Sequence, residues 1–200
     1  MIQDKTSIIQ VLAGLLKDPS RLSETDKYQL EKSDFPERFH KIIFAAIYNL
    51  YNSGTEVINE VEIDGFLSKY DVQYEIFNQN NGVEFLQEIQ ELYKEENFDY
   101  YYERLKKFSL VREMKGLGFD ISEVYDDTLM NPREREELQE KFDNMTIEDI
   151  LSIYEEKIID VKDKFESDAE ARGIQAGEGI DELLERLEES PDIGLPLNSE

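Results

Sequence analysis

Apolar residues recur at helical spacing along most of this 200-residue chain. The first run, over residues 8–16, stops at Asp18-Pro19, because a residue before proline is pushed out of the α region. A second run follows Asp34, the predicted N-cap, and ends at Asn52-Ser53-Gly54. Shorter runs over 58–69 and 83–93 indicate two further helices, with residues 70–79 irregular or briefly helical between them. These segments predict a compact all-α head over residues 1–95.

Two longer helical patterns follow, each with apolar residues at alternating spacings of three and four. The first covers residues 98–124, with Gly116 and Gly118 inside the helix, and the second covers 146–165. The break between them holds a charged segment, 133–142. Matching seams on two consecutive helices predict an antiparallel helical hairpin over residues 96–166. The seam residues expected to form an interface between copies are Leu110, Met114, Leu117, Ile121, Ile147, Leu151, Tyr154 and Ile158.

The composition changes after Phe165, where few large apolar residues occur. We interpret residues 167–200 as a linker that contains a short amphipathic helix, GIDELLERLEES. Its apolar face has no neighbouring element to cover it, so we expect it to dock on another subunit. That face consists of Ile180, Leu183, Leu184 and Leu187. The chain closes on DIGLPLNSE without a terminating pattern, and we expect a further domain to follow.

The formal net charge is −25, with 47 acidic residues against 22 basic ones. Such a surface repels phosphate backbones, so strong DNA binding by this chain is not expected. The acidity leaves open a second interpretation, a free-standing adaptor or DNA mimic that binds a basic partner. The absence of cysteine excludes disulfides and zinc–thiolate sites. The chain has no signal peptide and no apolar run of membrane length, so we expect a cytoplasmic protein without membrane contact.

No pattern of residues indicates catalysis or a cofactor. The single histidine, His40, lies in the first turn of an apolar helix, where a structural role is favoured over catalysis. It has no second histidine or cysteine with which to bind a metal, and no phosphate-binding loop occurs. Acidic pairs such as Glu95-Glu96 are typical of solvated faces. A helical enzyme with a carboxylate site is thus a third alternative, with no motif behind it.

The serial order of these segments resembles the N-terminal domain of DnaB-type replicative DNA helicases. The opening IIQVLAGLLKDPSRL resembles the first helix of that family, and DFPERFHKIIFAAIYNLYNSG resembles its second major helix. The resemblance covers residues 6–165. The matching positions are Asp34, Phe35, His40, Ile43, Phe44, Ala46, Ile47, Leu50 and Gly54; then Gly82, Phe85, Leu86, Ile89 and Leu92; then Phe98, Tyr101, Leu105, Val111 and Arg112; and finally Ile147, Ile150, Leu151, Tyr154, Glu155 and Ile158.

The resemblance implies a non-catalytic module that builds a homo-oligomeric collar, from dimer to hexamer, and recruits a primase or a helicase loader. It also implies a motor domain beyond this chain, which would hold the ATP and Mg²⁺ that are not expected here. The strong acidity and the long charged junction at 126–144 depart from usual members. The acidity indicates a relative encoded by a phage or a mobile element.

Overall fold

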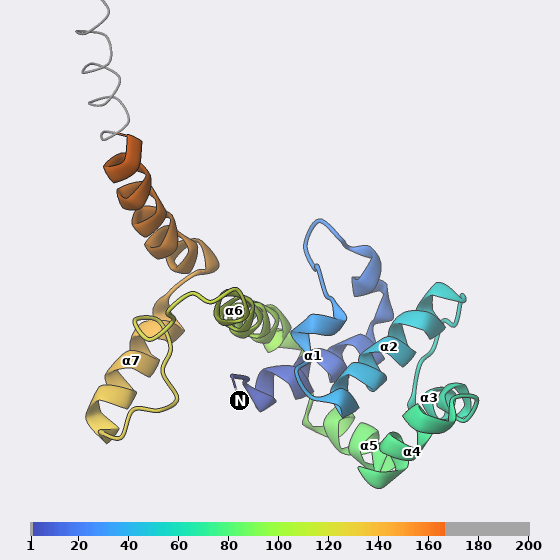
Figure 1. Ribbon diagram of the computed structural model, residues 1–200. Helices are drawn as coiled ribbons and strands as arrows, with labels where there is room; N and C mark the ends of the chain where they lie inside the picture. Colours follow the sequence, from blue (N-terminus) through green and yellow to red (C-terminus); the bar gives the residue numbers. More distant parts are fainter. Residues whose placement is uncertain (1, 167–200) are drawn as a thin grey trace, which may run out of the picture. The chain divides into compact units, whose positions relative to one another are not determined.

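All regular structure in the described part of the chain is helical (Figure 1). The computed structural model describes residues 2–166. The absence of any strand in that range confirms the predicted all-α class. The chain divides into two units, Met1–Ile147 and Glu148–Glu200. In order, the elements are α1 (Lys5–Lys17), η1 (Pro19–Ser23), η2 (Lys32–Asp34), α2 (Arg38–Asn52), α3 (Glu60–Leu67), α4 (Asp71–Gln79), α5 (Gly82–Leu92), η3 (Glu95–Asn97), α6 (Phe98–Gly116), α7 (Pro132–Asn144) and a helical run over residues 147–166.

Helix α1 is the centre of the core in the first unit. It contacts α2, α5 and α6, and its residues Ile8, Leu12 and Leu15 are fully buried. The helix starts at a clear N-cap, because the Asp4 carboxylate accepts a hydrogen bond from the Thr6 backbone N–H at 3.3 Å. The N-cap determines where α1 begins, and the apolar residues of α1 form the surface on which the other helices pack.

The start of α6 approaches α1 closely at Gly14. A Cβ atom at Gly14 would lie 2.3 Å from the Phe98 ring. The Arg21 guanidinium lies over that ring, 3.9 Å from its centroid, and also donates to the Tyr93 hydroxyl at 2.7 Å. Because α6 starts inside the core around α1, the predicted boundary between residues 95 and 96 falls within the first unit.

Asp34 has a different role from the one predicted. Helix α2 begins at Arg38, with Glu37 as its N-cap residue. The Asp34 side chain, 1% exposed, instead closes η2 by accepting the Glu31 backbone N–H at 2.8 Å. Lys106 of α6 donates to both carboxylate oxygens of Asp34 at 3.0 Å. The segment before α2 is therefore held to α6 by a buried carboxylate.

The first helix of the predicted hairpin is shorter than expected, since α6 ends at Gly116 and not at residue 124. Gly118 adopts a φ of 91°, a left-handed conformation that cannot continue the helix. The Phe119 N–H donates to the Met114 carbonyl and the Gly118 N–H donates to the Lys115 carbonyl, both at 3.0 Å. These bonds form a Schellman motif. Gly118 therefore ends the helix in which it was predicted to lie.

The charged segment after the break folds as α7 and packs through one aromatic residue. Phe142 is fully buried, and its ring lies 5.0 Å from Phe108 of α6 and 5.6 Å from Tyr125. Lys107 is 8% exposed, and its ammonium group donates to the carbonyls of Phe142, Asp143 and Met145 at 2.9–3.1 Å. A cation at the end of a helix satisfies carbonyls that have no partner within the helix. This contact fixes the C-terminal end of α7 to α6.

Candidate interaction surfaces

The predicted interface residues from the first hairpin helix do not form one exposed stripe. Met114 and Ile121 are buried, with 8% and 7% exposure, and Leu110 is half-buried. Leu117 is 68% exposed, but it lies at the end of α6, and Ile121 lies beyond that helix. The turn at Gly118 interrupts the helical spacing on which the predicted seam depended.

The helical run over 147–166 does expose several apolar residues. Ile147 is half-buried and Tyr154 is buried, whereas Leu151 and Ile158 are exposed. Val161 and Phe165 are also exposed. Val161 follows Ile158 by three residues and Phe165 follows Val161 by four, so all three lie on one helix face. We call this set of exposed residues the apolar stripe: Leu151, Ile158, Val161 and Phe165, with exposed fractions of 37, 54, 56 and 67%.

The other predicted docking face lies outside the described residues. It consists of Ile180, Leu183, Leu184 and Leu187.

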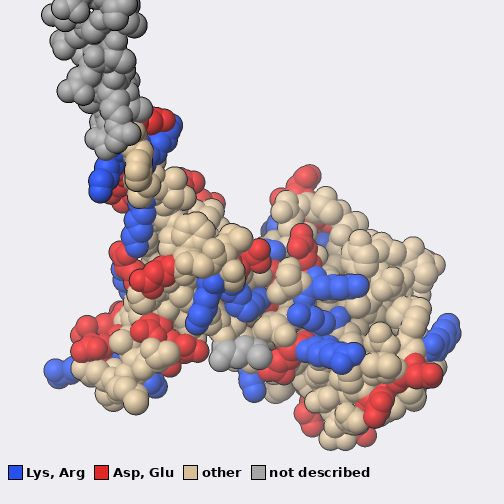
Figure 2. All heavy atoms as spheres, viewed as in Figure 1, with Lys and Arg blue, Asp and Glu red and all other residues tan. Residues whose placement is uncertain are grey.

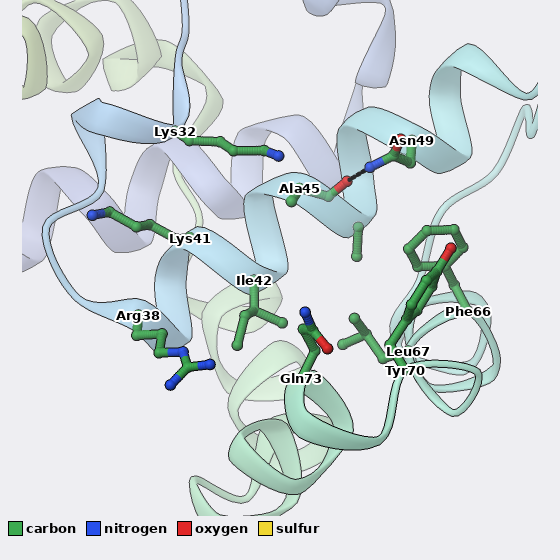
Figure 3. A pocket seen from close by; sticks show the side chains of 11 residues that line it. Lys32, Arg38, Lys41, Ile42, Ala45, Asn49, Phe66, Leu67, Tyr70 and Gln73 are labelled. Carbon is green, nitrogen blue, oxygen red and sulfur yellow. Dashed lines mark hydrogen bonds between the residues drawn. The ribbon is translucent and has the colours of Figure 1, made fainter.

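A groove in the first unit lies between α2 and the pair α3–α4, with a volume of about 380 Å³ (Figure 3). Ile42 and Leu67 form its buried floor, and Ala45 leaves the space open because its side chain is a single methyl group. The rings of Phe66 and Tyr70 lie along one side, with centroids 5.3 Å apart. Tyr70 is 46% exposed, so a large apolar surface meets solvent at this place.

Three cations line the same groove, and no carboxylate does. Lys32, Arg38 and Lys41 make no ion pair with any residue in the range 2–166. Figure 2 shows Lys and Arg side chains gathered over the region of α1 and α2. The sequence held a signal for this cluster, since Arg38 and Lys41 are three residues apart on one helix in an otherwise acidic chain.

His40 is a packed core residue. Its ring lies 5.5 Å from Phe39 and 5.8 Å from Phe85, and its side chain is 9% exposed. The Nδ1 atom makes no hydrogen bond and lies 3.7 Å from a Glu37 carboxylate oxygen. Burial lowers the pKa of His40, an effect that Lys5 reinforces and Glu37 opposes. These contacts agree with the structural role predicted for this residue.

Neither a metal cluster nor a membrane helix occurs in the range that the structure describes. Within residues 2–166, no group of Asp, Glu or His side chains converges in a way that would hold a metal ion. No helix in this range has the length and apolar character that a membrane crossing requires.

Comparison with known proteins identifies the larger part of the first unit. Residues 9–107 match the family described as the DnaB-like helicase N terminal domain. This part of the chain is a DnaB-like helicase N-terminal domain. The fold resembles the crystal structure of the N-terminal domain of DnaB helicase from Mycobacterium tuberculosis, with a TM-score of 0.50 and 22% identity over 58% of this chain and 80% of that one. The predicted resemblance is therefore confirmed.

A second relative relates the chain to phage proteins. All 200 residues match the SPbeta prophage-derived uncharacterized protein YorI of Bacillus subtilis (strain 168) with 60% identity. The chain spans 40% of the length of that protein. The match to the DnaB-like family ends at residue 107, within α6, so α7 and the apolar stripe lie beyond the matched part.

Proposed function

We propose that this chain is the non-catalytic assembly and partner-docking module of a replicative DNA helicase. The DnaB-like N-terminal domain supports this role, as does the longer prophage-derived relative, of which the chain covers the smaller part. In this proposal, ATP and Mg²⁺ act in a motor domain outside these residues. A primase or a helicase loader would bind the assembled module, and DNA would pass it without strong attachment because both are negatively charged.

The apolar stripe is the observation that carries the proposal. Ile158, Val161 and Phe165 are each more than half exposed on one face of a helix whose opposite face is acidic. A row of large apolar side chains is unfavourable in water, and each contributes about 1.5–3 kcal/mol when it becomes fully buried. Pairing with the same stripe of a second copy, related by a two-fold axis, would cover it.

The oligomeric state of the chain tests this proposal. Multi-angle light scattering over a hundred-fold range of protein concentration is expected to show the mass rising from one copy toward a multiple. The double variant Ile158→Ser, Phe165→Ser removes two residues of the stripe, and we expect it to shift association to at least ten-fold higher concentration. Ile159→Ser is the matched control, because Ile159 is 53% exposed on the same helix but lies about 100° away from Ile158.

Two outcomes would contradict the proposal. Equal weakening by both variants would show that the effect is not specific to the stripe. A single-copy mass at every concentration would instead favour the acidic adaptor. The measurements need physiological salt or more, because copies with a net charge of −25 repel one another when screening is weak.

A further inference from the structure

We propose that the groove between α2 and α3–α4 binds an acidic segment of a partner protein that carries bulky apolar side chains. This inference deepens the partner-docking part of the proposed function and rests on it. The groove lies wholly within Met1–Ile147, so its occupancy does not depend on the apolar stripe.

The charge of the groove is opposite to that of the chain. The protein has 47 acidic residues against 22 basic ones, yet all three charged residues that line the groove are basic. Carboxylates within the same fold already pair with other cations: Asp34 accepts from Lys106, and Asp4 accepts from Arg104 at 2.8 Å. Among the residues that the structure describes, Lys32, Arg38 and Lys41 have no such partner. A ligand with carboxylates would supply the missing charge, and Arg38 can bind a carboxylate through two parallel hydrogen bonds.

The floor of the groove determines the second property of the ligand. Ile42, Leu67 and Phe66 form an apolar surface, and the Tyr70 ring extends it to solvent. A volume of about 380 Å³ lies within the usual range of ligand pockets. Leucine-type side chains would fill it, as apolar anchors do when a peptide docks in a groove.

A nucleic acid is disfavoured as the ligand for two reasons. Phosphate groups would suit the three cations, but the net charge of −25 opposes the approach of a polyanion. A sugar–phosphate backbone would also leave the apolar floor uncovered. A short acidic peptide satisfies both the cations and the floor, and it carries far less charge than DNA.

Fluorescence anisotropy with the full chain tests the inference. The probe is a fluorescein-labelled peptide in which Leu recurs every three or four residues among Glu. Two further peptides replace either every Leu by Ser or every Glu by Gln. We expect the first peptide to bind and each of the others to bind at least ten-fold more weakly, because both the apolar contacts and the charge are needed.

Two groove variants and one control locate the binding site. Arg38→Glu with Lys41→Glu reverses two cations, and Ala45→Leu fills the groove while it retains every charge. We expect each to weaken binding of the first peptide at least ten-fold. Lys115→Glu is the matched control, since Lys115 is exposed on α6 and lies outside the groove. Circular dichroism verifies that each variant is folded.

Four results of the binding experiments would overturn the inference. They are the absence of binding by the first peptide, binding that is unchanged in all the groove variants, equal loss in the Lys115→Glu control, and preferential binding of a labelled single-stranded oligonucleotide that the charge reversal abolishes. Light scattering tests whether a second copy of this chain, and not a partner protein, occupies the groove. If the groove variants change the mass of the assembly, a second copy of this chain fills the groove, and the partner assignment is wrong. If they leave the mass unchanged while peptide binding is lost, the groove proposal stands whether or not the stripe drives assembly.

Discussion

Replacing Gly14 by alanine tests how closely α1 and α6 pack. In an exposed helix interior, this substitution stabilises a protein by up to about 1 kcal/mol, because glycine is the poorer helix former. At Gly14, however, the new methyl group would lie 2.3 Å from a ring carbon of Phe98 and 2.9 Å from an Arg21 nitrogen. A carbon–carbon contact that short cannot persist, so the ring must move.

The surroundings of Phe98 make that movement costly. The ring is 2% exposed, with the Arg21 guanidinium over it and the edge of Tyr28 at a centroid distance of 5.2 Å. Overpacking of this kind costs about 1–3 kcal/mol, and loss of the cation–π and aromatic contacts adds about 1–2 kcal/mol. These costs exceed the gain in helix propensity. We therefore expect Gly14→Ala to lower the free energy of unfolding by about 2 kcal/mol.

Gly65 provides the matched control for this prediction. It lies in the interior of α3, and a Cβ atom added there would have no neighbour within 4 Å. The same substitution, Gly65→Ala, is therefore expected to raise the free energy of unfolding by about 0.5–1 kcal/mol. Both residues belong to the unit Met1–Ile147, so the two variants report on the same unfolding transition.

Urea denaturation followed by circular dichroism measures both effects. With a slope of about 2 kcal/mol per molar urea, Gly14→Ala lowers the midpoint by about 1 M, and Gly65→Ala raises it by about 0.3–0.5 M. Adding Phe98→Leu to Gly14→Ala is expected to cost less than the sum of the two single substitutions, because the smaller side chain relieves the contact. A higher midpoint for Gly14→Ala, or strict additivity with Phe98→Leu, would refute the close approach.

Three further predictions concern the ends of helices and the buried histidine. Lys107→Met removes a charged donor from three carbonyls at the end of α7, and we expect it to lower the free energy of unfolding, measured by urea denaturation, by about 2 kcal/mol. Lys115 is exposed, so we expect the control Lys115→Met to change that free energy by no more than about 0.5 kcal/mol. Gly118→Ala imposes a left-handed conformation on alanine and is expected to lower the unfolding free energy by about 1–2 kcal/mol, whereas Gly116→Ala, with nothing near its added methyl group, does not lower it. Burial lowers the pKa of His40 below 6.5, so as the pH falls through that value the unfolded chain binds a proton before the folded one does. We therefore expect the free energy of unfolding to fall toward low pH in the natural chain more than in the His40→Gln variant. Thermal unfolding of both proteins between pH 5 and pH 8, values that bracket the usual histidine pKa, checks this, and parallel curves would contradict it.

The periodicity of apolar residues predicted the helices of the head well, because local rules determine them. The proline after Asp18 and the sequence Asn52-Ser53-Gly54 mark the ends of α1 and α2 in the structure, as expected. Asp34 was wrongly assigned as an N-cap, since the same residue type also closes a 3₁₀ turn and pairs with a distant lysine. Lys106, which decides between these roles, is 72 residues away, and no local rule detects it.

The residues of an interface were harder to predict than the helices of the head, because a heptad pattern does not show where a helix ends. The spacing of Met114, Leu117 and Ile121 continues across Gly118, although the backbone turns there. The apolar residues after the turn, Ile121 and Val124, are buried although they are not in a helix. The same spacing of apolar residues therefore covers both a helix and an irregular segment. The groove was missed for another reason. Its floor combines residues of α2 and α3, and its shape depends on how those helices pack.

The two proposed surfaces are expected to respond to salt in opposite directions, which allows one titration to separate them. Association through the apolar stripe brings together copies of net charge −25, so added NaCl screens their repulsion and strengthens assembly. The groove instead joins Lys32, Arg38 and Lys41 to a ligand of opposite charge, so the same salt weakens peptide binding. Between about 0.05 and 0.5 M NaCl, where the screening length falls roughly three-fold, we expect the mass by light scattering to rise while the anisotropy signal falls. If both signals changed in the same direction, one surface would be responsible for both events, and the assignment of separate roles to the stripe and the groove would be wrong.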